Sequence, residues 1–178
     1  MGRCWSSSAT ERFVARLASA AIGDTFNQYA DSALRCERLC AYLDARTAAP
    51  VVLVGEAAGY RGARVSGIPF TSERQLSGAG PAEATATLVQ RTLTELGAGD
   101  DVLLWNVVPT HPGTRTSNRR PTRVEVEQAR PFLDAITRGR RVVAIGRLAE
   151  TATGARYVRH PSHGGGTAFA AMLRECLQ

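Results

Sequence analysis

Lysine is absent from this sequence of 178 residues, and arginine supplies all 22 of its basic side chains. With 16 acidic residues, the formal net charge is +6. A guanidinium group offers a planar pair of donors that matches phosphate, so an arginine-only basic surface suits a nucleic acid. A GC-rich genome would also favour arginine codons, and composition therefore leaves nucleic-acid binding as one of two explanations.

Long hydrophobic runs are also missing. None approaches the roughly 20 apolar residues that span a bilayer, and residues 1–13 lack the apolar core of a signal peptide. The length suits one domain, which we expect to cover 1–178. We therefore expect a monomeric, cytoplasmic protein that does not bind membranes.

Cysteine is scarce and occurs only at positions 4, 36, 40 and 176. Cys36 and Cys40 are four residues apart in a helical segment, so they share a face and fit two small buried side chains. A metal or iron–sulfur site would need more ligands nearby. We therefore expect a reduced compartment without disulfides, no metal and no other cofactor.

Helical and strand patterns alternate along the chain. Capping signals with apolar spacing predict helices, and short apolar runs predict strands. The expected helices cover 9–22, 24–46, 81–96, 122–138, 147–153 and 169–177, and the expected strands cover 51–54, 102–106, 141–145 and 155–159. This alternation predicts an α/β fold with three layers, α/β/α, around a central four-stranded parallel sheet. The helices of 9–46 should pack on that sheet.

Three of the predicted strands run into polar or glycine-rich segments. These are GEAAGY at 55–60, WNVVP at 105–109 and RHPSHGGG at 159–166. Parallel strands end at the same edge of a sheet, where α/β proteins bind their ligands. We therefore expect the three segments to form one site.

The first segment belongs to a stretch, 51–73, that reads as a strand followed by a binding loop. Its glycines let the backbone approach a ligand closely. It has neither the ending of a P-loop nor the glycine spacing of a dinucleotide-binding loop. Phe70 in this loop is either a core residue or a stacking platform for a flat ligand.

The second and third segments supply Asn106 and His160. A buried amide needs partners, so Asn106 either ties down a loop or offers a donor and an acceptor to a base edge. A fixed amide fits the N3–H and O4 of uracil and opposes the reversed pattern of cytosine. His160 is either structural or a functional residue on a surface loop. A zinc site formed with His111 and His163 matches no familiar ligand spacing.

The 107–121 loop is rich in arginine, hydroxyl and amide side chains, which suit phosphate binding. The alternative is a solvated loop. The candidates for contact with DNA are Arg115, Ser117, Asn118 and Arg119, together with Arg61 and Arg64 near the first loop.

Taken together, these motifs resemble the uracil-DNA glycosylase superfamily over roughly residues 50–175. The resemblance rests on GEAAG followed by GIPFTSE, on LLWNVVP and on RHPSHGG, in the family's order. It implies the same α/β/α fold and the removal of uracil from DNA by hydrolysis of the N-glycosidic bond. The sequence is similar to the GEAPG-type branch, but it lacks the four-cysteine pattern that holds an iron–sulfur cluster in some of its members.

The resemblance also implies roles for individual residues. Phe70 would stack on the base, Asn106 would read it, and His160 would face its O2 oxygen. Gly55, Ala57 and Gly59 would belong to the base-binding wall, and Ser162, Gly164 and Gly165 to the loop that contacts DNA. Glu56 is the first candidate for positioning the attacking water, and Glu73 is the second.

Several positions depart from the family pattern. Ala57 stands where the best-studied members have Asp, and Ala58 stands where the GEAPG motif has Pro. Gly59 corresponds to the position at which some members exclude thymine with a Tyr. The glycine-rich segment 163–166 lacks a bulky residue that would wedge into DNA.

We therefore predict a monofunctional hydrolase, a DNA glycosylase that initiates base excision repair on DNA containing uracil or a related damaged base. Ala57 motivates one alternative, a non-catalytic nucleic-acid-binding protein on the same fold. A domain that binds a small nucleotide metabolite is the third possibility.

Overall fold

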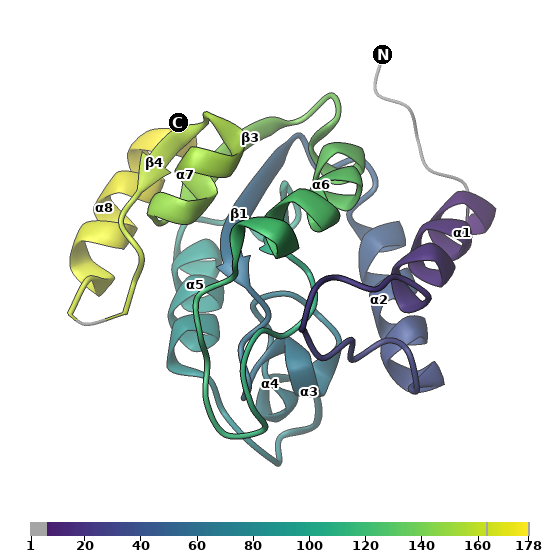
Figure 1. Cartoon of the computed structure of the whole chain (residues 1–178). Helices are drawn as coiled ribbons and strands as arrows, with labels where there is room; N and C mark the ends of the chain where they lie inside the picture. The colour runs from purple at the N-terminus through teal and green to yellow at the C-terminus, as the bar shows by residue number, and fades with distance from the viewer. Residues whose placement is uncertain (1–6, 163, 178) are drawn as a thin grey trace.

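The structure, a computed structural model, describes residues 7–162 and 164–177. Its centre is a sheet of four parallel strands in the order β2-β1-β3-β4 (Figure 1). The strands are β1 (Val51–Ala57), β2 (Val102–Val108), β3 (Arg141–Ile145) and β4 (Arg156–Val158). Helices cover both faces, which confirms the predicted three-layer α/β/α fold.

One face of the sheet packs against α1 (Ser7–Ala18), α2 (Ala33–Ala45), α6 (Arg123–Thr137) and α7 (Arg147–Thr153). Trp105 is fully buried at its centre. The Phe13 ring lies 5.7 Å, centroid to centroid, from the rings of both Trp105 and Phe132. Because side chains alternate along a strand, the neighbours of Trp105 in β2 point to the opposite face.

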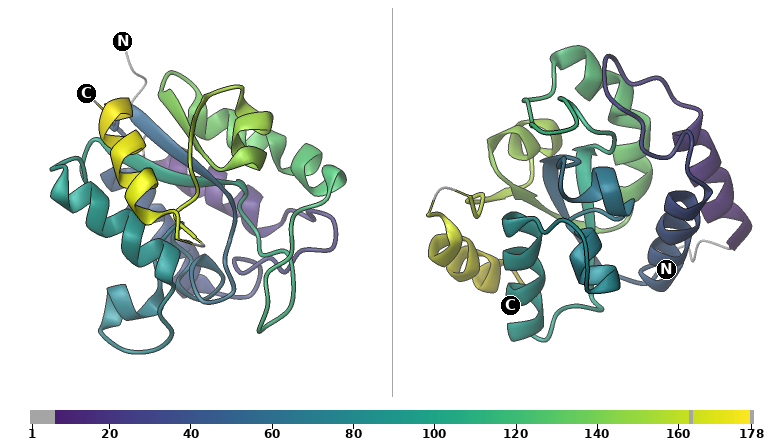
Figure 2. Two further views of the ribbon diagram at one scale, coloured as in Figure 1. Left: turned by 90° about the vertical axis from the view of Figure 1, so that its left-hand side faces the viewer. Right: turned by 90° about the horizontal axis from the view of Figure 1, so that it is seen from below.

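The opposite face packs against α5 (Ala84–Glu95) and α8 (Gly166–Leu177), which lie side by side in both views of Figure 2. Val89, Leu93, Phe169 and Leu173 bury this face. Two short helices, α3 (Ala63–Ser66) and α4 (Glu73–Ser77), follow β1 near the carboxyl end of the sheet (Figure 1). They were not predicted, because four or five residues are too few to show a helical period.

Two predicted helix starts are wrong. The helix expected from residue 24 begins at Ala33, where the Ser32 hydroxyl accepts a hydrogen bond from the Arg35 N–H. Residues 24–32 instead form an irregular segment whose side chains bind other loops; the Gln28 amide, for example, donates to the carbonyl of Pro109. The helix expected from Pro81 begins at Ala84, with Glu83 as its N-cap residue.

The long edge strand, β2, is covered by a side chain. The Leu104 N–H donates to the Tyr42 hydroxyl at 2.6 Å, so α2 occupies a backbone group that would otherwise face outward. The other edge strand, β4, has only three residues.

Within the described ranges, none of the helices combines the length and the apolar character required to cross a bilayer.

Candidate active site

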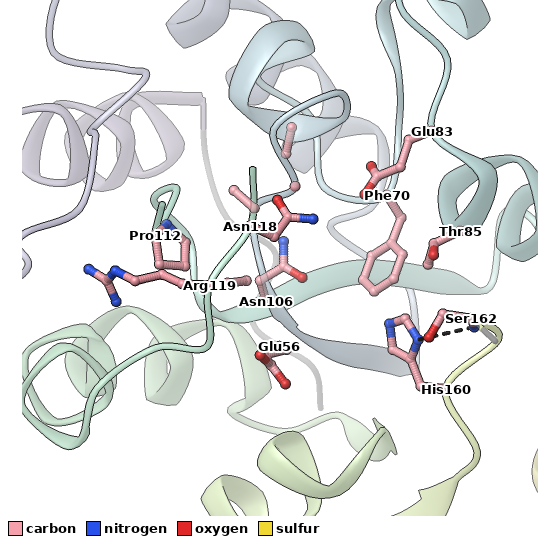
Figure 3. Close-up of a pocket in the computed structure, with 14 residues that line it drawn as sticks. Glu56, Phe70, Glu83, Thr85, Asn106, Pro112, Asn118, Arg119, His160 and Ser162 are labelled. Carbon is pink, nitrogen blue, oxygen red and sulfur yellow. Dashed lines mark hydrogen bonds between the residues drawn. The ribbon is translucent and has the colours of Figure 1, made fainter. Parts of the chain in front are cut away.

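A cavity of about 400 Å³ opens at the carboxyl ends of β1 and β2 (Figure 3). It is formed by the end of β1, the glycine loop after it, the end of β2, the 112–119 loop and the segment after β4. The lining residues are Glu56, Ala57, Ala58, Gly59, Ala63, Phe70, Glu83, Thr85, Asn106, Pro112, Asn118, Arg119, His160 and Ser162. The three strand-end segments therefore meet, as the sequence predicted.

The Phe70 ring forms one wall of this cavity. It is 8% exposed and belongs to the core under α5 and α8, so it is both a core residue and a cavity residue. Its φ of 50° is the one positive φ of a non-glycine residue in the described part of the chain. A bulky residue keeps such a backbone only where the surroundings hold it, and such positions cluster at functional sites.

Gly55 allows the Phe70 ring and the Asn106 amide to meet. Gly55 pairs with Asn106 across the neighbouring strands. A Cβ on Gly55 would overlap the Phe70 ring and lie 3.0 Å from Asn106 Oδ1. The absence of a side chain at position 55 therefore brings a flat ring and a polar amide into one pocket.

Asn106 is the most informative side chain of the site. It is 3% exposed and lines the cavity. In the described residues, its side-chain amide has no hydrogen-bond partner, so the loop-tying alternative has no contact to support it. Its polar atoms face the cavity instead of being sealed in the core, so a ligand that fills the cavity can supply the hydrogen-bond partners that the described residues do not.

His160 is oriented by Ser162, its neighbour on the segment after β4 that lines the cavity (Figure 3). The Ser162 N–H lies 3.2 Å from His160 Nδ1, and the Ser162 hydroxyl lies 2.8 Å from the same atom. A backbone N–H can only donate, so Nδ1 accepts and a neutral ring carries its proton on Nε2. The predicted DNA-contacting residue Ser162 thus also sets the tautomer of His160.

Glu56 is the half-buried carboxylate at the end of β1. Burial raises the pKa of Glu56, and the nearby Arg120 guanidinium opposes that rise. The second candidate, Glu73, lies outside the cavity lining and forms a two-pronged ion pair with Arg38 at 2.8 and 3.0 Å. The hydrogen bonds from Arg38 lower the pKa of Glu73. Of the two predicted carboxylates, the structure places only Glu56 in the cavity.

Arg119 and Asn118 hold the cavity wall together. The Arg119 guanidinium pairs with the Glu125 carboxylate through contacts of 2.8 and 2.5 Å. Glu125 is 1% exposed, and its hydrogen bonds from Arg119 lower its pKa to about 2. Asn118 Oδ1 accepts a hydrogen bond of 2.9 Å from the Tyr60 N–H, so it links the second loop to the glycine loop.

The other arginines predicted to contact phosphates, Arg61, Arg64 and Arg115, belong to the two loops that line the cavity but are not lining residues themselves. The Arg64 guanidinium stacks 4.6 Å above the Phe26 ring, and its buried Nε has no partner in the described residues. Burial lowers the pKa of Arg64, as do the positive charges of Arg115 and Arg35. Arg61, stacked 5.3 Å over a tyrosine ring, adds another exposed charge. Arg61, Arg64 and Arg115 flank lining residues along the chain, and we call them the basic cluster.

The remaining residues predicted to bind the base or DNA lie in the loops at or near the cavity. Ala57 and Gly59 line the cavity, and Ser117 is exposed, with its hydroxyl 2.8 Å from that of Thr114. Gly165 tightens the turn after His160, because a Cβ there would overlap the His160 carbonyl oxygen. Gly164 adopts a φ of +74° in open space.

His111 holds two of these loops in place. Its Nδ1 lies 2.7 Å from the Ala58 carbonyl oxygen, and its Nε2 lies 2.8 Å from that of Thr114. The described residues contain no group of three potential metal ligands. His163, considered above for a zinc site, lies outside the described residues, as does Cys4.

Sequence reasoning missed Glu83, Thr85 and Pro112 as cavity residues. A helix that begins at Pro81 would place Glu83 in its first turn, where acidic residues are common, so no local signal indicates a side chain that lines the cavity.

Comparisons with known proteins agree with this architecture. The sequence profile of the Uracil DNA glycosylase superfamily matches residues 43–173. No curated protein sequence matches the chain significantly. Among solved structures, the chain is similar to the crystal structure of wild-type Pedobacter heparinus SMUG2, with a TM-score of 0.69 and 11% sequence identity. The alignment covers 94% of this chain and 96% of that chain, and it shows a shared fold.

Proposed function

The chain belongs to the uracil DNA glycosylase superfamily, and we propose that it hydrolyses the N-glycosidic bond of uracil, or of another deaminated base, in DNA. The reaction would initiate base excision repair. The protein acts as a monomer without a cofactor under this proposal, and its partner is DNA that contains the damaged base.

The amide of Asn106, which faces the cavity without a hydrogen-bond partner among the described residues, carries the proposal. It lies in one cavity with a flat ring, Phe70, and a ring N–H donor, His160. A base stacked on Phe70 can offer Asn106 both a donor and an acceptor. Uracil presents N3–H beside O4, whereas cytosine presents the opposite order and would leave the amide facing like groups.

A base inside a duplex cannot reach this cavity, so the target nucleotide must leave the helix stack. The basic cluster of Arg61, Arg64 and Arg115 belongs to the two loops that also line the cavity, and it suits the phosphates of the flanking strand. Binding should therefore weaken as salt rises, because each neutralised phosphate releases counterions.

The chemical step separates charge. The C1′–N1 bond breaks, its electrons stay on the uracil ring, and the sugar becomes positively charged. His160 Nε2–H donates to the O2 oxygen on which the negative charge develops, and one such donor is typically worth about 3–4 kcal/mol. The family resemblance implied this role, and the bond from Ser162 to Nδ1 supports it.

Glu56 acts on the other reactant. Its carboxylate binds the attacking water, accepts a proton as the water oxygen bonds to C1′, and offsets the positive charge of the sugar. The pKa of Glu56, raised by burial, makes it a stronger base than a solvated carboxylate. This assignment needs no Asp at Ala57, where the sequence departs from the best-studied members.

The test uses purified protein with single- and double-stranded oligonucleotides that contain one uracil, followed by alkali to cut abasic sites. We expect cutting at the uracil position and none in the matched cytosine oligonucleotide. Salt-dependent DNA binding without base release in any pairing context would contradict the proposal. That result would favour the non-catalytic nucleic-acid-binding protein instead.

A further inference from the structure

The Glu83 carboxylate packs against the glycine loop rather than on the helix that it precedes. Glu83 is the N-cap residue of α5, yet its side chain makes no capping hydrogen bond. A Cβ on Gly59 or Gly62 would overlap this carboxylate, so both glycines leave room for it. The side chain lines the cavity together with Phe70 and Asn106.

This carboxylate has no hydrogen bond or ion pair to any residue that the structure describes. Burial alone raises the pKa of Glu83. An acid at a helix start is ordinarily explained by the helix dipole or by capping, and both keep the carboxylate near the first N–H groups or in water. Neither accounts for a half-buried carboxylate that lines a cavity and has no partner among the described residues.

The position of Glu83 in the cavity identifies the part of the base that it would meet. In Figure 3, Glu83 and His160 lie on opposite sides of the Phe70 ring, with Asn106 facing the space between them. Around the uracil ring, O2 is followed by N3, then by C4 with its O4, and then by C5. With O2 at His160 and the N3–O4 edge at Asn106, C5 points toward Glu83.

We propose that Glu83 is a specificity-determining residue that selects the target base at its C5 edge. The inference rests on the proposed glycosylase function. A carboxylate there accepts a hydrogen bond from a donor attached to C5, such as a hydroxymethyl group. It disfavours the thymine methyl group, which would cover the carboxylate and give it no partner. Gly59 contributes no side chain, so Glu83 is the wall at this edge.

The experiment measures kcat/KM on four oligonucleotides that differ at one position only: uracil, 5-hydroxymethyluracil, thymine and cytosine, each opposite guanine. Wild type is compared with Glu83→Ala, Glu83→Gln and the control Glu95→Gln. Glu95 is an exposed residue at the far end of the same helix, 3.5 Å from its i−4 partner, Arg91. The melting temperature of each variant is recorded alongside.

We expect Glu83→Ala to raise the thymine-to-uracil ratio of kcat/KM about tenfold, because the methyl group no longer covers a buried acceptor. Glu83→Gln should lower the preference for 5-hydroxymethyluracil about fivefold, since a neutral acceptor binds a hydroxyl more weakly than a carboxylate does. Glu95→Gln should leave both ratios within twofold of wild type.

Ratios that stay within twofold of wild type in the Glu83 variants would overturn the inference while leaving the glycosylase function intact. If Glu83→Ala does not fold, the near-isosteric variant Glu83→Gln still tests the inference, through its ratio of kcat/KM on 5-hydroxymethyluracil to kcat/KM on uracil. A wild-type protein that releases no base from any oligonucleotide would overturn the proposed function as well, so the two failures are distinct.

Discussion

Replacing Asn106 with leucine should make the protein more stable and inactive at the same time. The amide is 3% exposed and has no partner in the described residues, but its polar atoms face the cavity and are not fully buried, so the folded protein carries only part of a desolvation cost of about 1–3 kcal/mol. Leucine has the same branched side-chain skeleton, with methyl groups in place of the amide oxygen and nitrogen. The amide also borders a cavity that admits water, so we expect the lower end of this range, about 1 kcal/mol. In a protein of this size that corresponds to a rise in Tm of about 2–4 °C.

The same substitution removes both hydrogen bonds to the base. At about 1.5 kcal/mol each, their loss should lower kcat/KM on a uracil oligonucleotide by at least about 100-fold. Urea unfolding gives the change in the free energy of unfolding, and the alkali-cleavage assay gives the rate. An inactive variant that is also more stable would show that the amide serves a ligand rather than the fold.

Asn27→Leu is the matched control. The Asn27 amide donates to the carbonyl oxygens of Leu17 at 2.8 Å and Ala20 at 3.1 Å, so its loss should destabilise the protein. If Asn106→Leu destabilises the protein as Asn27→Leu does, the Asn106 amide has a structural partner and the reasoning about the base pocket is wrong.

Three further predictions concern charge and shape. Glu56→Gln should lower kcat at least about 100-fold and remove the fall in activity as pH drops through the raised pKa of Glu56, measured as a pH–rate profile. Arg119→Ala should leave the buried Glu125 carboxylate without its ion-pair partner, with the Thr122 N–H still donating to it, and lower stability by about 2 kcal/mol at pH 7, measured by urea unfolding. Gly55→Ala should displace the Phe70 ring and raise KM for uracil DNA about tenfold or more, measured in the cleavage assay.

Each of these predictions has a contrary result. An unchanged pH–rate profile in Glu56→Gln would assign the water to another group. The pKa of Glu125 is lowered to about 2 in the folded protein, so wild type should lose this stabilisation as pH falls from about 4.5 toward 2. If the Arg119→Ala variant shows the same loss of stability over this pH range, groups other than Arg119 lower the pKa of Glu125. Unchanged KM in Gly55→Ala would mean that the Phe70 ring relocates freely.

The sheet and the convergence of the three motifs could be predicted because both follow from local patterns. Apolar runs identify strands such as Val102–Val108, and parallel topology then brings their ends together. Gly55 and Asn106 are therefore expected neighbours, and the register confirms that they are paired. The roles expected of Phe70, Asn106 and His160 came from the resemblance to a glycosylase family. All three residues line the cavity, so substitutions there can test those roles.

The parts that could not be predicted depend on tertiary contacts. Residues 24–32 resemble the start of a helix, but the bond from Gln28 to the Pro109 carbonyl holds them in an irregular path. Glu83 enters the cavity because Gly59 and Gly62 leave space for it across the chain. Arg119 pairs with Glu125 only once the loop folds onto α6. No spacing rule on one segment reports such contacts.

The hydroxyl of Tyr42 at the edge of β2 also limits pairing of this edge strand with other chains in a crowded solution. An open edge strand is a template on which another chain can extend the sheet. Burial raises the pKa of Tyr42 to about 12, so the hydroxyl stays protonated, and it occupies the Leu104 N–H that an incoming strand would need. The other edge strand, β4, has only three residues, so neither edge of the sheet offers a long open strand for pairing with another chain. This arrangement suits the proposed monomer.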